Sequence, residues 1–371
     1  MSTVGRILGA AGLATGIIGA AALGGVTAQR MAVKRYRSAL TDLTREELLG
    51  ELTPDRTYSV AAEDGVVLHV EEVGPVNAPL TIFFSHGWTL RSGSWHFQRL
   101  GLAGPGFGTG EAGSPATRMV FYDHRSHGKS TRAPAAHSTM EYLASDLRHV
   151  IATAASDAPI VLVGHSMGGM AILTLAAQEP ALFADRVIGI GLICTGATYL
   201  RQTQFNQLLV TTGNPVVRAI TNVAVRYPAI FERGRAGSRD AVWLLTRSLG
   251  FAKDVPGPLV DYLDEMVSAT PVEVIADYAP TLFSFDQSAA LPALTGIPTA
   301  IISGDQDRLT PLARSQAIAD VLPDAEFVIA HGAGHMTMME DPDLTNEALR
   351  RMLERATSYG GISVKRRKVR R

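Results

Sequence analysis

The sequence predicts an α/β fold: a doubly wound, mostly parallel sheet with a helical cap insertion and an N-terminal hydrophobic helix. Short apolar runs alternate with helical patterns between residues 57 and 358. Such alternation is typical of a parallel sheet that is covered by helices on both faces. Residues 197–296 contain no obvious buried strand. That stretch is too long for an ordinary connection between strands, so it indicates an inserted cap.

The N-terminal segment, residues 1–37, contains an uncharged apolar stretch at residues 7–28. As a helix rising about 1.5 Å per residue, this stretch would just cross a hydrocarbon layer roughly 30 Å thick. We therefore expect membrane association through residues 7–28 as a single uncleaved span. The basic residues that follow the span favour a cytoplasmic catalytic domain. The small residues of Val26-Thr-Ala28 leave an alternative open, in which a signal peptide is removed and the protein is secreted.

The remaining elements follow the chain in order. An amphipathic linker helix is expected over residues 38–56, and the turn Asp64-Gly65 joins two strands of alternating polarity. The expected strands cover residues 57–62, 66–73, 80–85, 118–122, 159–163, 186–194, 297–303 and 326–330. This division places the core at residues 57–196 and 297–358, the helical cap at 197–296 and a basic tail at 359–371.

Composition and charge exclude several classes of function. The formal net charge is −1, yet both ends of the chain are basic and contain no acidic residue, which leaves the middle acidic. A nucleic-acid-binding domain carries its basic face on the folded part, so we expect no nucleic-acid partner. The single cysteine, Cys194, excludes a disulfide framework and a zinc site of several cysteines. No histidine and carboxylate cluster has metal-ligand spacing, so we expect neither a metal nor another cofactor.

The stretch Gly164-His-Ser-Met-Gly-Gly169 follows a predicted strand and precedes a predicted helix. A serine at so sharp a corner needs neighbours without side chains two positions away on each side, and glycines stand at both positions. The corner would present Ser166 Oγ above the edge of the sheet. The backbone N–H of Met167 would face an oxyanion formed there. Ser166 is therefore the candidate nucleophile, and Met167 a candidate oxyanion donor.

A nucleophilic serine needs a base and an acid, and in this architecture both follow it along the chain. Asp307 is favoured over Asp305 as the acid, because Asp307 stands between Gly304 and Pro311 in the turn after a predicted strand. Residues 195–231 contain no Asp or Glu that could take this role instead. His335 is favoured over His331 as the base, because it follows the glycines that make a mobile turn.

A second oxyanion donor is expected in His86-Gly87-Trp88, directly after the strand at residues 80–85. Gly87 allows close approach, and the Trp88 amide is the candidate donor. We assign Trp88, His86 and His165 to the substrate-binding region. Trp88 is expected to wall the pocket, His86 to hold its loop by hydrogen bonds, and His165 to pack beneath the nucleophile.

These motifs together resemble the α/β-hydrolase superfamily, specifically its serine esterase, lipase and perhydrolase-like branch, from about residue 57 to about 358. The matching stretches are Ser85-His-Gly-Trp88, Asp123-His-Arg-Ser-His-Gly-Lys-Ser130, Gly164-His-Ser-Met-Gly-Gly169, Gly304-Asp-Gln-Asp307 and Gly334-His335. One departure stands out, because Ser126 occupies a position where many relatives have glycine. It puts the backbone geometry of that turn in doubt more than the chemistry.

The resemblance implies an esterase that acts on lipid-like or small apolar carboxylic esters through Ser166, His335 and Asp307 and an acyl-enzyme. The same parts could serve a thioesterase, a carbon–carbon bond hydrolase, an acyltransferase or a perhydrolase. A different class also stays open, in which a non-catalytic protein of this fold holds a ligand under its cap.

Overall fold

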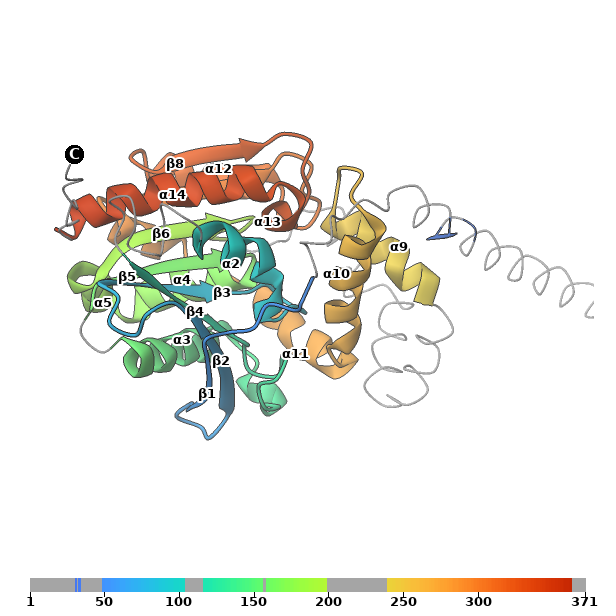
Figure 1. Ribbon diagram of the computed structural model, residues 1–371, viewed down its shortest axis with the longest axis horizontal. Coiled ribbons are helices and arrows are strands. Elements are labelled where there is room, and N and C mark those ends of the chain that lie inside the picture. The colour runs from blue at the N-terminus through green and yellow to red at the C-terminus, as the bar shows by residue number, and fades with distance from the viewer. Residues whose placement is uncertain are drawn as a thin grey trace, which may run out of the picture.

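The computed structural model describes residues 49–103, 116–155, 158–198 and 239–361, together with Met31, Val33 and Lys34. Its centre is an eight-stranded sheet with the strand order β1-β2-β4-β3-β5-β6-β7-β8 (Figure 1). The strands are β1 (Arg56–Ala61), β2 (Val67–Val73), β3 (Leu80–Ser85), β4 (Thr117–Tyr122), β5 (Ile160–His165), β6 (Val187–Ile193), β7 (Thr299–Gly304) and β8 (Glu326–Ala330). The predicted α/β sheet is therefore confirmed.

The sheet is parallel except at one edge. β1 pairs with β2, and β2 with β4, in antiparallel register, whereas every neighbouring pair from β4 to β8 is parallel. Parallel strands need long crossovers, and here helices supply most of them. All residues of β3, β5, β6 and β7 are buried, as expected of interior strands with helices on both faces.

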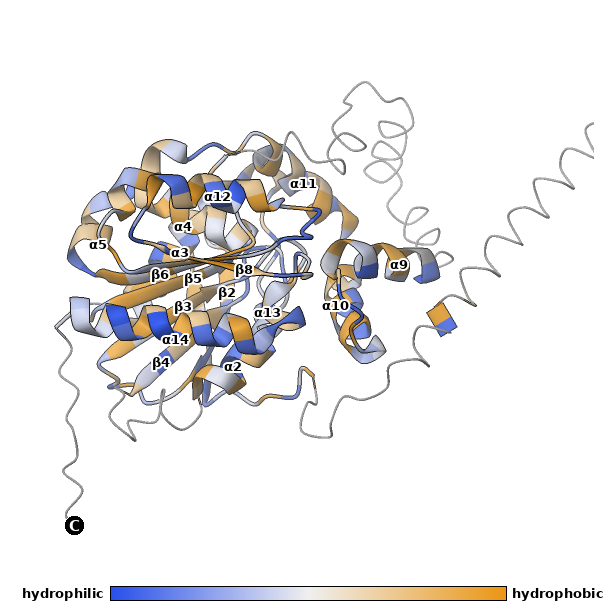
Figure 2. Cartoon of the chain, turned by 90° about the horizontal axis from the view of Figure 1, so that it is seen from above, coloured by the Kyte–Doolittle hydropathy of each residue, from blue (hydrophilic) through white to orange (hydrophobic). Residues whose placement is uncertain are grey.

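Helices cover both faces of this sheet (Figure 2). On one face lie α3 (Met140–Ala154), α4 (Met167–Gln178), α5 (Pro180–Asp185) and α12 (Leu312–Val321), and on the other α2 (His96–Ala103), α13 (Thr337–Glu340) and α14 (Pro342–Tyr359). Side chains along a strand alternate between the faces. Phe83 therefore belongs to the hydrophobic core on the face of α3 and α4, whereas Ile82 and Phe84 belong to the core on the face of α2 and α14.

Three α-helices in the described chain fill the sequence between β6 and β7. They are α9 (Arg239–Gly250), α10 (Gly257–Ala269) and α11 (Val272–Phe283). Short 3-10 helices occur at three places along the whole described chain, namely η1 (Ser92–Trp95), η2 (Ala135–His137) and η3 (Ser288–Leu294). α9 and α10 lie beyond one end of the sheet (Figure 1). Several apolar residues assigned to the cap are buried, namely Trp243, Phe251, Tyr262 and Met266. Phe205, Leu208 and Leu209 lie outside the described residues.

Most of the predicted linker helix, residues 38–56, also lies outside the described residues. Its last part, residues 49–55, forms a turn followed by non-helical chain, and β1 begins at Arg56. The helix expected there does not extend to residue 56, since the chain already pairs with β2 at that point.

The predicted membrane location requires a correction. No helix within the described part of the chain is both long enough and apolar enough to cross a membrane. This finding contradicts the expected single N-terminal span with its cytoplasmic catalytic domain. The stretch that was expected to form the span, residues 7–28, and the basic tail from residue 362 onward lie outside the described residues.

Candidate active site

Ser166 occupies the corner between β5 and α4, with φ 51° and ψ −117°. A positive φ is strained for a non-glycine residue and costs on the order of 1–3 kcal/mol, so the surroundings must enforce it. The neighbouring glycines make this corner sterically feasible. A Cβ on Gly168 would lie 2.0 Å from the Ser85 carbonyl oxygen, and one on Gly164 would lie 2.6 Å from the Gly169 nitrogen. The Gly-x-Ser-x-Gly spacing is thus required by contacts within the turn and with the chain after β3.

Asp307 and His335 lie together at the ends of β7 and β8. His335 Nδ1 is 2.8 Å from Asp307 Oδ2, and both residues are buried. The other carboxylate oxygen, Oδ1, accepts the backbone N–H groups of Leu309 and Thr310, each at 2.8 Å. Because a carboxylate only accepts, Nδ1 carries the proton in this contact, which leaves Nε2 of a neutral imidazole as an acceptor.

The two rival residues from the sequence analysis form a separate pair. His331 Nδ1 lies 3.0 Å from Asp305 Oδ2, and the Gly332 N–H donates to Asp305 Oδ1 at 2.7 Å. The hydrogen bond from His331 holds the pKa of Asp305 below its usual value. The His331 side chain is 83% exposed, so this pair lies on the surface rather than beside Ser166.

Ser166 and His335 line the same cavity, which has a volume of about 280 Å³. Trp88 and His165 also contribute to its wall, and most of the rest is apolar. The apolar lining comes mainly from α9, α10 and α11, through Val242, Leu245, Leu249, Leu263, Val267, Ile275, Leu282 and Phe283. Within the described residues, the Ser166 hydroxyl has no hydrogen-bond partner. The hydrogen bond between a catalytic hydroxyl and its base often tightens only when substrate is bound.

The predicted oxyanion donors lie on two turns that pack closely together. The Gly168 position, directly after Met167, approaches the carbonyl oxygens of Ser85 and His86, which begin the loop that carries Trp88. In the described part of the chain, neither the Trp88 nor the Met167 backbone N–H has an acceptor. Both amides are therefore available to a bound oxygen.

His86 is fully buried and does not line the cavity. Its Nδ1 donates to the Gly87 carbonyl at 2.7 Å, and its Nε2 accepts the His124 N–H at 2.9 Å. Burial lowers the pKa of His86 to about 4, which keeps the ring neutral. This arrangement suits the loop-holding role that the sequence predicts for His86 rather than substrate contact.

His165 lines the cavity beside Ser166 and also holds the loop of the candidate base. Its Nε2 lies 3.0 Å from the backbone carbonyl of His335, to which it donates. Burial, with a smaller effect of His335, lowers the pKa of His165 well below its usual value. A neutral His165 therefore ties the nucleophile corner to the base loop.

Sequence reasoning missed two residues that hold this constellation. Thr310 Oγ1 lies within hydrogen-bond distance of Asp307 and of the Cys194 carbonyl, and Glu340 Oε2 accepts the Gly334 N–H at 2.5 Å. Glu340 Oε1 accepts the Ala252 N–H at 2.8 Å, which links the His335 loop to the segment after α9. Burial raises the pKa of Glu340 despite these donors. Both residue types are common, so only their spatial neighbours distinguish them.

One group of potential metal ligands occurs in the described residues. Cys194 Sγ, an Asp307 oxygen and a His335 ring nitrogen lie within 4.8 Å of one another. The thiol donates to Thr337 Oγ1 at 3.2 Å, and burial raises its pKa strongly. His335 Nδ1 and Asp307 Oδ2 are hydrogen-bonded to each other, so the potential ligand atoms of this group already have partners within the protein.

Comparison with known proteins places this geometry in a family. Residues 82–348 match the alpha/beta hydrolase family. The chain belongs to that family. A bifunctional esterase/perhydrolase of Acinetobacter calcoaceticus is 36% identical over 121 residues, a match that covers 33% of this chain and 39% of that relative. A pimeloyl-[acyl-carrier protein] methyl ester esterase of Xanthomonas oryzae pv. oryzae is 25% identical, and the match covers 77% of this chain and 98% of that enzyme.

A solved structure extends the comparison to the fold. The thermophilic esterase from Thermogutta terrifontis superposes with a TM-score of 0.63 at 24% identity, covering 81% of this chain and 99% of that chain. This likeness shows that the two chains share a fold. The turn at Ser126 keeps a left-handed backbone with φ 66°, and the Ser126 hydroxyl accepts the Ala133 N–H at 2.9 Å. Serine therefore adopts here the geometry for which glycine is better suited.

Proposed function

We propose that this chain is a serine hydrolase that cleaves carboxylic esters with an apolar acyl group. One observation carries the proposal: Ser166 and His335 line one largely apolar cavity, and His335 is hydrogen-bonded through Nδ1 to the buried Asp307. The esterase relatives support the same class of reaction. The cap at residues 197–296 supplies the acyl-binding wall in this proposal.

In the first half of the proposed reaction, His335 Nε2 takes the Ser166 proton while Oγ attacks the ester carbonyl. The amide groups of Trp88 and Met167 donate to the oxyanion of the tetrahedral intermediate. Its collapse returns the carbonyl, and the imidazolium gives its proton to the departing alcohol. Asp307 stabilises the imidazolium and keeps the proton of the neutral ring on Nδ1.

In the second half, His335 removes a proton from water, which attacks the acyl-enzyme. The new tetrahedral intermediate uses the same two amides, and its collapse releases the acid and restores the Ser166 hydroxyl. A ring nitrogen of His335 thus accepts or donates the proton in every transfer. The negative charge develops at the same oxygen position in both halves of the reaction.

The cavity volume sets an expectation for substrate size. An engineered apolar cavity of about 150 Å³ accepts benzene in another protein, so a cavity of about 280 Å³ accommodates a larger acyl group. Each buried methylene contributes about 0.8 kcal/mol, which corresponds to roughly a fourfold gain in kcat/KM until the cavity is full.

The test is hydrolysis of p-nitrophenyl esters of increasing acyl length by the full chain, with Ser166→Ala as the control. We expect turnover that rises with chain length, then levels off, and is lost in the variant. Labelling of the wild type by a fluorophosphonate probe, and none of the variant, would identify the nucleophile. A folded wild type that neither turns over any ester nor reacts with the probe would contradict the proposal and favour a ligand-binding role.

A further inference from the structure

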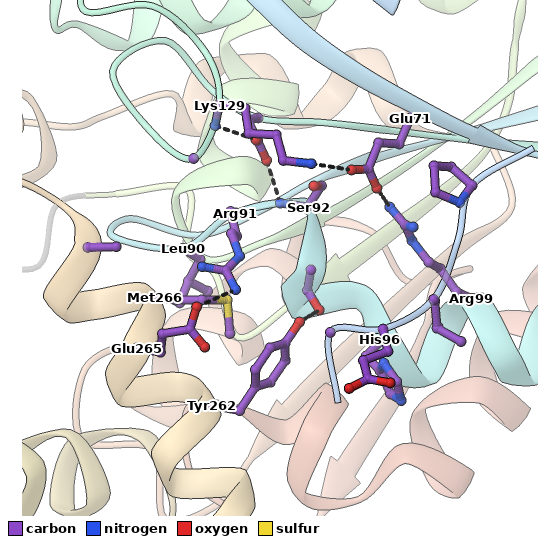
Figure 3. A pocket seen from close by; sticks show the side chains of 18 of the residues that line it. Glu71, Leu90, Arg91, Ser92, His96, Arg99, Lys129, Tyr262, Glu265 and Met266 are labelled. Atoms are coloured by element: carbon purple, nitrogen blue, oxygen red, sulfur yellow. Dashed lines mark hydrogen bonds and ion pairs between the residues drawn. The ribbon is translucent and has the colours of Figure 1, made fainter. Parts of the chain in front are cut away.

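A second cavity, of about 600 Å³, lies beside α10 (Figure 3). Tyr262, Glu265 and Met266 of α10 line the second cavity, whereas Leu263 and Val267 line the first. The lining of the second cavity also differs in chemistry, because it contains Arg91, Arg99, Lys129, Glu51, Glu71, Asp123 and Glu265. It is a chamber rich in charged side chains, and the proposed hydrolysis does not use it.

Arg99, in α2, is the buried cation of this chamber. Its side chain is 6% exposed and lies over the Phe121 ring, with the guanidinium carbon 4.3 Å from the ring centre. A guanidinium has five N–H donors, yet in the described residues Arg99 has one hydrogen bond, from Nη2 to Glu71. Its Nε is buried without a partner. Buried donors are normally satisfied, so a guanidinium left in this state points to an absent acceptor.

Glu71 alone does not satisfy the guanidinium of Arg99, because its carboxylate also interacts with two other side chains. Its carboxylate is also 3.4 Å from Lys129 Nζ and 3.1 Å from His69 Nε2. Burial by itself would raise the pKa of Glu71, but the donors His69 and Arg99 and the charges of Arg99 and Lys129 lower it to about 2. One carboxylate therefore faces two permanent cations on this wall.

The other acids of the chamber are occupied or solvated. Asp123 accepts the backbone N–H groups of Ser92 and Lys129, at 2.7 Å and 2.8 Å. Glu265 pairs with Arg91 at 2.9 Å, and Glu51 is exposed. His96, which precedes Arg99 by one helical turn, is 2% exposed and has a ring nitrogen without a partner. Unpaired donors of Arg99 and an unpaired ring nitrogen of His96 thus lie close together in α2.

We propose that this chamber binds a small oxyanion, a carboxylate or a phosphate group, on the guanidinium of Arg99, with Lys129 at the opening. The planar fork of arginine matches both groups, which accept two parallel hydrogen bonds from it. The Lys129 side chain is 69% exposed and carries a charge that attracts such an anion. The site is separate from Ser166, so its occupancy does not depend on the proposed hydrolysis.

The test is isothermal titration of the full chain with inorganic phosphate and, separately, with acetate, each against sodium chloride at the same ionic strength. We expect saturable binding of at least one probe beyond the chloride control, and the stronger probe identifies the oxyanion. Arg99→Met keeps a long apolar stem over Phe121 and removes every donor, so it should weaken binding about tenfold or more.

Two further variants keep the test decisive if Arg99→Met does not fold. Lys129→Met changes an exposed side chain at the opening and should weaken binding several-fold. Arg132→Met removes a cation that pairs with Asp277 outside the chamber and should leave binding unchanged. Absence of saturable binding by either probe, or equal affinity in Lys129→Met and Arg132→Met, would overturn the site.

Discussion

The hydroxyl oxygen of Thr310 lies 2.7 Å from Oδ2 of Asp307, the carboxylate oxygen that also accepts from His335 Nδ1. The same hydroxyl is 2.7 Å from the Cys194 carbonyl and 3.2 Å from His335 Nδ1. Its single proton can be donated to only one of the two acceptors at a time. Thr310 therefore joins the candidate acid, the candidate base and the end of β6 through one buried oxygen.

Replacing Thr310 by valine preserves the shape and removes this oxygen. A hydrogen bond to a charged group contributes about 1.5–3 kcal/mol, so Thr310→Val should lower kcat on a p-nitrophenyl ester by about ten- to a hundredfold. KM should change little, because Thr310 acts through Asp307 and His335. Thr310→Ser keeps the hydroxyl and should recover most of the loss. Equal activity in the valine and serine variants would remove this positioning role.

Asp307 and Asp305 form a natural pair for comparison, because each accepts from a histidine but only one lies buried beside the cavity. Asp307→Asn should lower kcat by about 10⁴, since an amide no longer holds the imidazole in the productive tautomer. Asp305→Asn changes only the surface contacts with His331 and Gly332 and should leave kcat within about twofold. Steady-state kinetics on one ester measures both, and a large loss in Asp305→Asn alone would exchange the two assignments.

The sequence allowed the sheet to be predicted almost strand by strand, because each interior strand is an apolar run that ends at a glycine or polar turn. The candidate triad could also be proposed from the sequence, since its three motifs carry steric requirements that are visible there. Gly164 and Gly168, for example, flank a backbone that leaves no space for a Cβ.

The supporting contacts could not be predicted, because they join residues that have no motif of their own. Glu340 receives backbone donors from Gly334 and from Ala252, and neither spacing is recognisable in the sequence. The chamber at Arg99 likewise combines β2, α2 and α10. The membrane prediction rested on hydropathy and charge, and it was wrong because no helix among the described residues is long and apolar enough to cross a membrane.

Four buried histidines around the candidate active site predict a loss of stability in acid. Burial lowers the pKa of His86 to about 4 and of His127 to about 3, and lowers those of His124 and His165 well below the usual value. Near pH 6 the unfolded chain binds protons that the native chain does not. The free energy of unfolding therefore falls as the pH drops below about 6.5, by roughly 1.4 kcal/mol per pH unit for each histidine.

Urea unfolding at pH 7, 6 and 5 measures this dependence. His127→Phe removes one of the four groups, so its stability should depend less steeply on pH, by about one proton. His331→Ala, which changes a side chain that is 83% exposed, should keep the wild-type slope. Unfolding free energies that stay constant between pH 7 and 5 would show that these rings take up protons in the native protein at the same pH as in the unfolded chain.

The helices of the cap should set the acyl preference, because they supply most of the apolar wall around Ser166. Ile275 of α11 is half-buried and lines the cavity. Ile275→Trp should fill part of the cavity of about 280 Å³ and lower kcat/KM for the longest acyl esters about tenfold or more. The shortest ester should be hydrolysed as before, since it does not reach this wall.

Val321→Trp is the control, because it places the same ring on α12 at a position that is 44% exposed. This variant should leave the whole acyl profile unchanged. A uniform loss across all chain lengths in Ile275→Trp would mean that α11 supports the catalytic residues rather than the acyl group.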